Sequence, residues 1–242
     1  MFLSSICYSQ VVDVDNNEYQ IVNIGEQQWF SKNLMVKHYS DGTPIPQVTS
    51  PVEWEWTNIG AWCYINNDPS TEQVYGILYN NLAILGIHDN DPETPNKSIA
   101  VAGAKVPSVD DFEILIQYAG GYENAGNSLK SNQGWNSFDG NSGNGTNTTG
   151  FNAIPSGNRT RAGSFQNLGD NAVFHRTGSG SGLTSYFALN FVNNNVVISS
   201  VTGNWGQSLR LIKDLNGKTW LDDNILQDAG DTNIHIWRGQ DN

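Results

Sequence analysis

Three residues near the start of the chain have the spacing of calcium ligands. Asp13, Asp15 and Asn17 stand at positions i, i+2 and i+4, where a calcium-binding loop places oxygen ligands. The sixth position of such a loop is glycine, but here it is Glu18, and no glutamate occupies the position of the bidentate ligand. Asp and Asn also favour tight turns. We therefore predict a β-hairpin turn here and no calcium site.

The histidines do not supply a second metal site. The segment His88-Asp89-Asn90-Asp91 offers nitrogen and oxygen ligands, but one short cluster rarely completes a coordination shell. The four histidines are scattered without the spacing of zinc ligands: His38, His88, His175 and His235. We expect a solvated acidic loop, no metal and no cofactor.

Cysteine is the other candidate for chemistry, and the chain has two, Cys7 and Cys63. Cys63 lies in an aromatic segment, where the simplest role is that of a small buried hydrophobic residue. The sequence has no Gly-x-Ser-x-Gly elbow, phosphate-binding loop or dinucleotide fingerprint. Asp110 and Asp111 open a helix and have no visible acid–base partner. We predict no catalytic residue and do not expect an enzyme.

A recognition surface remains, in the last third of the chain, where aromatic rings are mixed with amides. Rings can stack on sugars, and amides both donate and accept hydrogen bonds. The predicted ligand-binding residues are Tyr186, Phe187, Asn190, Asn193, Asn194, Asn195 and Trp205, with Phe191 among them.

Two alternatives stay open at this surface. Because side chains alternate along a strand, either the pair Tyr186 and Ala188 or the pair Phe187 and Leu189 must face the core. The turn at residues 193–195 can equally be a plain hairpin loop. The Asn-, Gly- and Thr-rich loop at residues 139–149 is a second candidate contact region.

Composition limits the partners of such a surface. The 242 residues suit one large domain, and 24 acidic against 12 basic residues give a net charge of −12. Nucleic acids and anionic membranes attract clustered Lys and Arg, so neither is an expected partner. No segment approaches the roughly 20 apolar residues that cross a bilayer, and we expect no membrane insertion. Residues 1–10 lack a positively charged start and are expected to form an N-terminal tail, with a clipped signal as the alternative.

Strands and turns dominate the elements that must hold the surface. Residues 11–24 have the pattern of a hairpin, and Gly25 interrupts it. Further strands are predicted at residues 186–189, 196–198 and 208–212. The Gly- and Asn-rich stretch 133–152 has the composition of a linker, but inside one domain such a loop is more often functional or pinned by its neighbours.

Two helices are predicted. Leu78, Leu82 and Leu85 have helical spacing and predict a helix over residues 75–85. Ser108 is a good N-cap for a second helix that Gly120 and Gly121 end. Its expected buried stripe is Ile114, Leu115 and Tyr118. Two helices among short strands and long loops predict an α+β domain.

In order along the chain, several phrases resemble those of the Fibrobacter succinogenes major paralogous domain family. No single phrase decides the resemblance; the ordered set does. The phrases are Ile24-Gly25-Glu26-Gln27-Gln28-Trp29, Lys32-Asn33-Leu34, Trp62-Cys63-Tyr64-Ile65-Asn66-Asn67-Asp68, Tyr75-Gly76-Ile77-Leu78-Tyr79-Asn80, Val106-Pro107-Ser108, Gly150-Phe151-Asn152-Ala153-Ile154-Pro155 with Gly157 and Arg159, and Ser208-Leu209-Arg210-Leu211-Ile212-Lys213-Asp214.

The resemblance covers residues 11–214 and implies a fold akin to C-type lectin and formylglycine-generating-enzyme domains. We expect two short helices, small antiparallel sheets and long loops. Residues 215–242 are then a C-terminal extension, either a docking strand or a truncated repeat, because Leu215-Asn216-Gly217 and Trp220 echo the opening phrase.

The chain departs from the family pattern in two places. The family usually has cysteines where this chain has Ala100 and Leu211, so both halves of the bridge that the resemblance implies are absent. That absence suits folding in a reducing cytoplasm. The segment Phe174-His175-Arg176-Thr177 replaces a Trp-Ser-Ser-Thr phrase, so family-based site assignments there are unsafe.

The expected function is a non-catalytic recognition or decoration module on a bacteriophage virion, as a head-fibre, tail-fibre or capsid decoration protein. The alternative is a secreted or lipid-anchored bacterial adhesin, outside the cell or on its surface. A formylglycine-generating type of oxidase is a third reading and needs Cys63 in an open cleft. Expected partners are a cell-surface glycan or protein receptor, a neighbouring virion protein, or further copies of the chain in a homo-oligomer.

Overall fold

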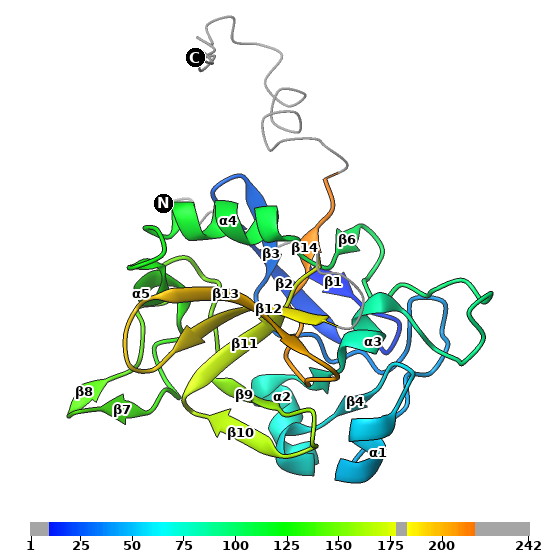
Figure 1. Ribbon diagram of the computed structural model, residues 1–242. Helices are drawn as coiled ribbons and strands as arrows, with labels where there is room; N and C mark the ends of the chain where they lie inside the picture. The colour runs from blue at the N-terminus through cyan, green and yellow to red at the C-terminus, as the bar shows by residue number, and fades with distance from the viewer. Residues whose placement is uncertain (1–9, 178–182, 216–242) are drawn as a thin grey trace, which may run out of the picture.

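Two five-stranded sheets carry most of the strand pairing in the computed structural model, which describes residues 10–177 and 183–215 (Figure 1). Every neighbouring pair in the first sheet is antiparallel. In spatial order its strands are β1 (Gln10–Val12), β2 (Glu18–Ile24), β3 (Gln27–Phe30), β14 (Ile212–Lys213) and β6 (Ala104–Lys105).

The second sheet is antiparallel apart from one pair. In spatial order its strands are β10 (Phe165–Leu168), β9 (Ser156–Arg159), β11 (Asn171–His175), β12 (Leu183–Asn190) and β13 (Val196–Thr202). The parallel pair is β9 with β11. Two further sheets have two antiparallel strands each. One pairs β4 (Trp62–Cys63) with β5 (Leu78–Tyr79), and the other pairs β7 (Ser137–Phe138) with β8 (Asn141–Ser142).

The helices are short. They are α1 (Pro51–Trp56), α2 (Glu72–Tyr75), α3 (Asn81–Leu85), α4 (Val109–Tyr118) and α5 (Ala125–Leu129), with 3₁₀ turns η1 (Ile65–Asn67) and η2 (Pro69–Thr71). The α+β class, with short helices and small antiparallel sheets, is as predicted. The expected number of two helices is wrong, because the described residues contain five α-helices.

The first hairpin forms where the sequence predicts it. Asn16 takes a left-handed conformation with φ of 64°, which Asn tolerates better than most residues. The Asp13 carboxylate closes the turn by accepting the backbone N–H groups of Asp15 and Asn17, each at 2.9 Å. It also accepts the Tyr19 hydroxyl at 2.7 Å. The spacing that resembles a calcium loop therefore builds a turn.

The helix predicted over residues 75–85 is wrong. Gly76 has φ of 75° and ends α2, and a Cβ there would lie 2.8 Å from the Cβ of Asn33. The chain then pairs as β5 before Asn80 caps α3 by accepting the backbone N–H of Ala83 at 2.9 Å. Helical spacing of leucines was misleading because this turn and cap divide the segment.

Helix α4 starts and ends as expected but buries a different stripe. Ser108 and Asp111 form a capping box, and Gly120 follows the last turn with φ of 110°. The buried residues are Phe112, Leu115 and Ile116, whereas Ile114 and Tyr118 are 52% and 60% exposed. The prediction that Ile114 and Tyr118 face the core is therefore wrong. The helix is rotated toward the Phe187 ring, which stacks on Phe112 with centroids 4.5 Å apart.

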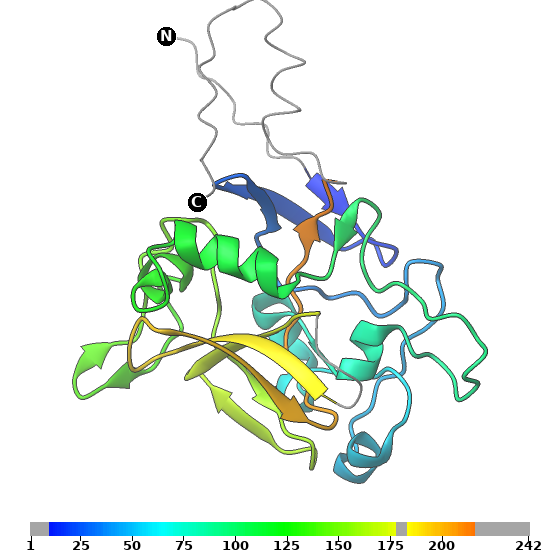
Figure 2. The ribbon, with the colours of Figure 1, turned by 45° about the horizontal axis from the view of Figure 1, so that its top comes forward.

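The second sheet has one face in the core and one face outside. Helix α4 lies over the β12–β13 hairpin in both orientations (Figures 1 and 2). The face toward it carries Phe174, Phe187 and Leu189, which join Phe112 and Leu115 in one hydrophobic cluster. Because strand residues alternate, Val173 and its cross-strand partner Ala188 belong to the opposite face.

A segment that links the two sheets replaces most of the strand predicted at residues 208–212. Ser208 donates its N–H to Val173 in the second sheet at 3.0 Å. The carbonyls of Leu209 and Leu211 accept the N–H groups of Leu34 and Phe30 beside the first sheet. Only Ile212 of the predicted strand lies in a strand, β14.

Arg210 lies at the centre of this linking segment and is fully buried. Its guanidinium donates to the Asn33 side-chain oxygen and to the backbone carbonyls of Phe30 and Phe151. The rings of Phe151 and Phe174 lie 4.8 and 5.5 Å from it. Burial lowers the pKa of Arg210 to about 9. A planar five-donor group thus ties three distant segments together.

Arg159 is a second buried guanidinium of the same kind. It donates to the carbonyls of Val48, Thr49 and Gly163, and it lies 4.4 Å from the centre of the Trp54 ring. The arginines of two family-like phrases are therefore part of the core and do not lie at a surface site.

We predict that Arg210→Met lowers the free energy of unfolding by about 3 kcal/mol or more, because several buried carbonyls lose their donor. Urea denaturation measures the loss. Arg161→Met is the matched control, since Arg161 is exposed, and it should change stability by less than about 0.5 kcal/mol. Equal effects of the two substitutions would contradict the clamping role of Arg210.

Candidate functional site

The outer face of the second sheet opens into a groove of about 270 Å³, which we call the amide groove. Small aliphatic side chains come from three neighbouring strands of the sheet, β11, β12 and β13. They are Val173, Ala188, Val197 and Val201. Five side-chain amides and two aromatic rings complete the lining: Asn158, Asn167, Asn171, Asn190, Gln207, Tyr186 and Trp205, beside Leu189.

The amides come from separate elements that strand pairing brings together. Asn171 and Asn190 are cross-strand partners in β11 and β12. Asn167 lies in β10, which pairs with β9, and donates its Nδ2–H to Oδ1 of Asn158 in β9 at 2.9 Å. Gln207 reaches the groove from the linking segment and is only 1% exposed. The groove is therefore built on paired backbone, which keeps its polar groups in place.

The two rings are held differently. Tyr186 stands on β12, and its neighbour across the sheet on β13 is Ser199. Trp205 follows β13 and donates its Nε1–H to the Thr202 carbonyl at 3.2 Å. This bond uses the one polar group of the indole, so the Trp205 ring can contribute only its apolar surface to a ligand.

Among the residues that the structure describes, no charged side chain lines the amide groove, although the chain carries a net charge of −12. Its polar contacts must therefore come from neutral amides, the Tyr186 hydroxyl and the backbone. Such a lining suits an uncharged polar ligand, because an ionic ligand would lose water without gaining an opposite charge.

The structure brings three of the predicted ligand-binding residues into this groove: Tyr186, Asn190 and Trp205. Phe187 is fully buried against Phe112, so its prediction as a surface residue is wrong. The open choice along the strand is thereby decided, with Phe187 and Leu189 in the core.

The turn after β12 has a structural role. Asn190 Oδ1 accepts the N–H groups of Val192 and Asn193, and Asn193 Oδ1 accepts that of Asn195 at 2.9 Å. Lys130, which directly follows α5, donates to the backbone carbonyls of Asn190 and Asn193. Asn193, Asn194 and Asn195 do not line the groove, and Phe191 packs edge-on against Phe138.

Sequence reasoning missed four of the lining amides: Asn158, Asn167, Asn171 and Gln207. Asn158 stands next to the buried Arg159 inside a family-like phrase, and Gln207 directly precedes the phrase that contains Arg210. Asn171 could have been found from the register, since it pairs with Asn190 when Phe174 is placed opposite Phe187.

The second candidate contact region, residues 139–149, is pinned at several points. Residues 137–142 contain the exposed pair of strands β7 and β8. Beyond it Gly145 donates its N–H to Ser131 and Thr146 to Asn127, at 2.9 and 2.7 Å. Neighbours therefore pin this loop, which is one of the two alternatives expected for residues 133–152, and residues 139–149 do not line the amide groove.

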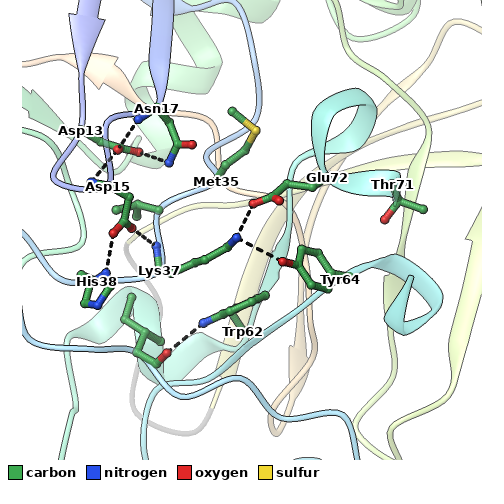
Figure 3. A network of polar contacts seen from close by, with 12 residues as sticks. Asp13, Asp15, Asn17, Met35, Lys37, His38, Trp62, Tyr64, Thr71 and Glu72 are labelled. Atoms are coloured by element: carbon green, nitrogen blue, oxygen red, sulfur yellow. Dashed lines mark hydrogen bonds and ion pairs between the residues drawn. The ribbon is translucent and has the colours of Figure 1, made fainter. Parts of the chain in front are cut away.

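A polar network near the first hairpin fixes that turn to the rest of the domain (Figure 3). Asp15 accepts the backbone N–H of Lys37 and contacts His38 Nδ1. The Lys37 ammonium bonds Tyr64 at 3.1 Å and Glu72 at 2.7 Å. A wider hollow of about 560 Å³ beside His38 has no Phe, Tyr or Trp among the described residues of its lining, so it lacks the large stacking rings of the amide groove.

The metal candidates are occupied by local bonds. Asp13 and Asp15 accept protein donors, as described above, and His88 contacts Asp89 at 3.2 Å. Asp89 and Asp91 each accept a backbone N–H two residues ahead, as in an ordinary polar turn. Within residues 10–177 and 183–215, no group of three His, Cys, Asp or Glu side chains could hold a metal ion.

Comparison with known proteins places the chain in one family. The family model described as the Fibrobacter succinogenes major domain matches residues 22–213. The chain belongs to this family. No curated protein and no solved structure matches it.

In this Fibrobacter succinogenes major domain, the departures noted in the sequence fall in the core, apart from the half-buried Arg176. Ala100 and Leu211, which stand where the family usually has cysteines, lie in the same hydrophobic cluster. Phe174 and His175 are fully buried in β11. Cys7, His235 and residues 216–242 lie outside the described residues. No helix of the described part is long and apolar enough to cross a membrane.

Cys63 is fully buried in this family member and packs with Trp54, Ile65 and Leu78. Trp56 is 71% exposed and takes no part in that cluster. Burial raises the pKa of the Cys63 thiol to about 11, although nearby Arg159 opposes the shift. The thiol is therefore neutral at pH 7, whereas a nucleophilic cysteine needs an accessible thiolate.

We predict that Cys63 is not alkylated by iodoacetamide in the folded protein at pH 8. The same peptide should be labelled fully in guanidinium chloride, and mass spectrometry of the peptide containing Cys63 measures both states. Rapid labelling of the folded protein would show an open thiol and would favour the oxidase reading.

His175 is a buried neutral histidine. Its Nε2–H donates to the Tyr79 carbonyl at 2.8 Å, and within the described part of the chain its Nδ1 has no hydrogen-bond partner. Burial lowers the pKa of His175 to about 4, from an ordinary value of 6.5. The unfolded chain therefore binds a proton on this residue at a higher pH than the folded chain does.

This difference predicts a pH-dependent stability. The contribution of neutral His175 is fully present above pH 6.5 and is lost as the pH falls to about 4, on the order of 3 kcal/mol in total. Urea denaturation at several pH values, compared with His175→Gln, isolates it from the titration of carboxylates. The variant should lose less stability than the wild type over this interval, and parallel curves would contradict the assignment.

Proposed function

We propose that this domain is a non-catalytic recognition module that binds a neutral saccharide in the amide groove. The observation that supports it is the lining itself, in which aromatic rings and side-chain amides surround an aliphatic floor and the described residues supply no charged group. Rings stack on the apolar faces of sugars, and amides match hydroxyl groups that both donate and accept hydrogen bonds.

The size of the groove supports a short ligand segment. Its volume of about 270 Å³ lies just below the roughly 300–1,000 Å³ typical of pockets for drug-sized molecules. The groove is open at the surface, so a longer glycan can extend beyond the sugar unit that the rings contact. A charged ligand such as a phosphate would need Lys or Arg, which the lining lacks.

The burial of Cys63 supports a role without catalysis. An oxidase of the formylglycine-generating type needs a reactive thiol, and here the Cys63 thiol packs under Trp54 with a raised pKa. We also propose that the fold is of the C-type-lectin-like kind, which accords with the mixture of short helices, small sheets and long connections.

The proposed setting is the surface of a bacteriophage virion, with a bacterial cell-surface adhesin as the alternative. Ala100 and Leu211 support the former, because a core that uses aliphatic residues there needs no oxidising compartment for a bridge at these positions. Neighbouring genes discriminate the two: capsid and tail genes favour the virion, and secretion or polysaccharide genes favour the adhesin.

A glycan array tests the binding function. Wild-type protein should bind a subset of neutral glycans, and the double variant Tyr186→Ala with Trp205→Ala should lose at least tenfold in affinity for them, since each ring contributes about 1 kcal/mol or more. Circular dichroism must show that the double variant is folded.

Trp56→Ala is the control, because Trp56 is exposed but lies outside the groove lining. It should bind as the wild type does. Equal losses from Trp56→Ala and from the double variant, or no binding of any neutral glycan by the wild type, would refute the proposed function.

A further inference from the structure

Gln207 carries an unpartnered acceptor in the wall of the amide groove. The residue is 1% exposed, and among the described residues its Oε1 has no hydrogen-bond partner. Its backbone is fixed, because the N–H and carbonyl of Gln207 bond the carbonyl and N–H of Tyr79, each at 3.0 Å. The side chain therefore starts from a rigid point and lines the groove.

A buried acceptor without a donor is costly. Such a group loses its water on folding and regains nothing, so nearly all buried polar groups in folded proteins are paired. Methionine would fill a similar volume without this cost. The presence of glutamine here points to a donor that arrives with a ligand.

His175 adds a second unpartnered acceptor from the same neighbourhood. Its Nε2–H and the Gln207 N–H donate to one carbonyl, that of Tyr79, at 2.8 and 3.0 Å. His175 Nδ1 also lacks a partner among the described residues, and burial keeps the ring neutral by lowering its pKa. Two residues that donate to the same carbonyl therefore each carry an acceptor without a donor among the described residues.

We propose that Gln207 is the specificity-determining residue of the amide groove and that its Oε1 accepts a hydrogen bond from a ligand hydroxyl. This inference rests on the proposed saccharide-binding function and narrows it. A free hydroxyl donates to Oε1, whereas a carboxylate, a phosphate or an ether oxygen presents only lone pairs there. The ligand is then a neutral sugar whose inserted edge bears an unsubstituted hydroxyl.

The first measurement needs no ligand. Gln207→Met replaces the acceptor with an apolar side chain of similar length, so the urea midpoint of the free protein should rise. Gln166→Met is the matched control, because Gln166 is exposed on β10, and its midpoint should not move. A midpoint that falls for Gln207→Met would show that the acceptor is already satisfied in the free protein, and it would overturn the inference.

The second measurement uses the neutral glycan with the highest affinity on the array and its monodeoxy analogues. Isothermal titration should show that Gln207→Met binds the parent sugar about tenfold more weakly than the wild type does. One analogue should bind the wild type about tenfold more weakly than the parent, yet bind Gln207→Met as the parent does. That pair identifies the hydroxyl that reaches Oε1.

The two proposals fail in different ways. If the wild type binds the sugar but Gln207→Met binds all analogues with the same losses as the wild type, the groove binds saccharide and the role of Gln207 is refuted. If no neutral glycan binds the wild type, both the saccharide-binding function and the proposed hydrogen bond from a sugar hydroxyl to Gln207 are refuted. The urea midpoint of Gln207→Met then still shows separately whether Gln207 Oε1 is an unsatisfied acceptor.

Discussion

The structure depends on a buried positive charge that has no carboxylate partner among the described residues. The Arg210 guanidinium is surrounded by carbonyl oxygens and aromatic faces, and these neutral groups must all converge for the charge to be tolerated inside the domain. Its acceptors come from residue 30, residue 33 and residues 151–152, which are far apart along the chain. Any arrangement that separated them would leave an uncompensated ion in the core.

The same linking segment that carries Arg210 also carries Gln207. Between these residues the chain alternates its attachments, with Gln207 bonded to Tyr79, Ser208 to Val173 and Leu209 to Leu34. Gln207, which lines the amide groove, is thus only three positions along the chain from Arg210 in the core. The geometry of the groove is therefore coupled to the packing of the core. Several family phrases have the same explanation: Asn33, Phe151 and Arg210 belong to three different phrases and meet at one point. These three residues hold the domain together, whereas Asn158, within one of the same phrases, lines the amide groove.

Local chemistry made some of the fold predictable. The Asp- and Asn-rich turn, the Ser108 cap and the alternation along β12 depend on near neighbours in the chain, and each was confirmed. Long-range contacts decided the rest. Gly76 ends a helix because Asn33 lies against it, and Ile114 faces solvent because α4 is oriented by the Phe187 ring. The site divides in the same way: Tyr186, Asn190 and Trp205 were visible as an aromatic and amide pattern, whereas Gln207 joins them only through pairing with β5.

The two-sided character of β12 has an evolutionary consequence. Phe187 and Leu189 anchor the strand from the core side, so Tyr186 and Ala188 can be exchanged with little effect on folding. Substitution on that outer row alone can redirect a duplicated gene copy toward a new binding partner while the scaffold persists. An inserted residue within the strand has no such freedom, because a shift of one position would turn every anchoring side chain outward.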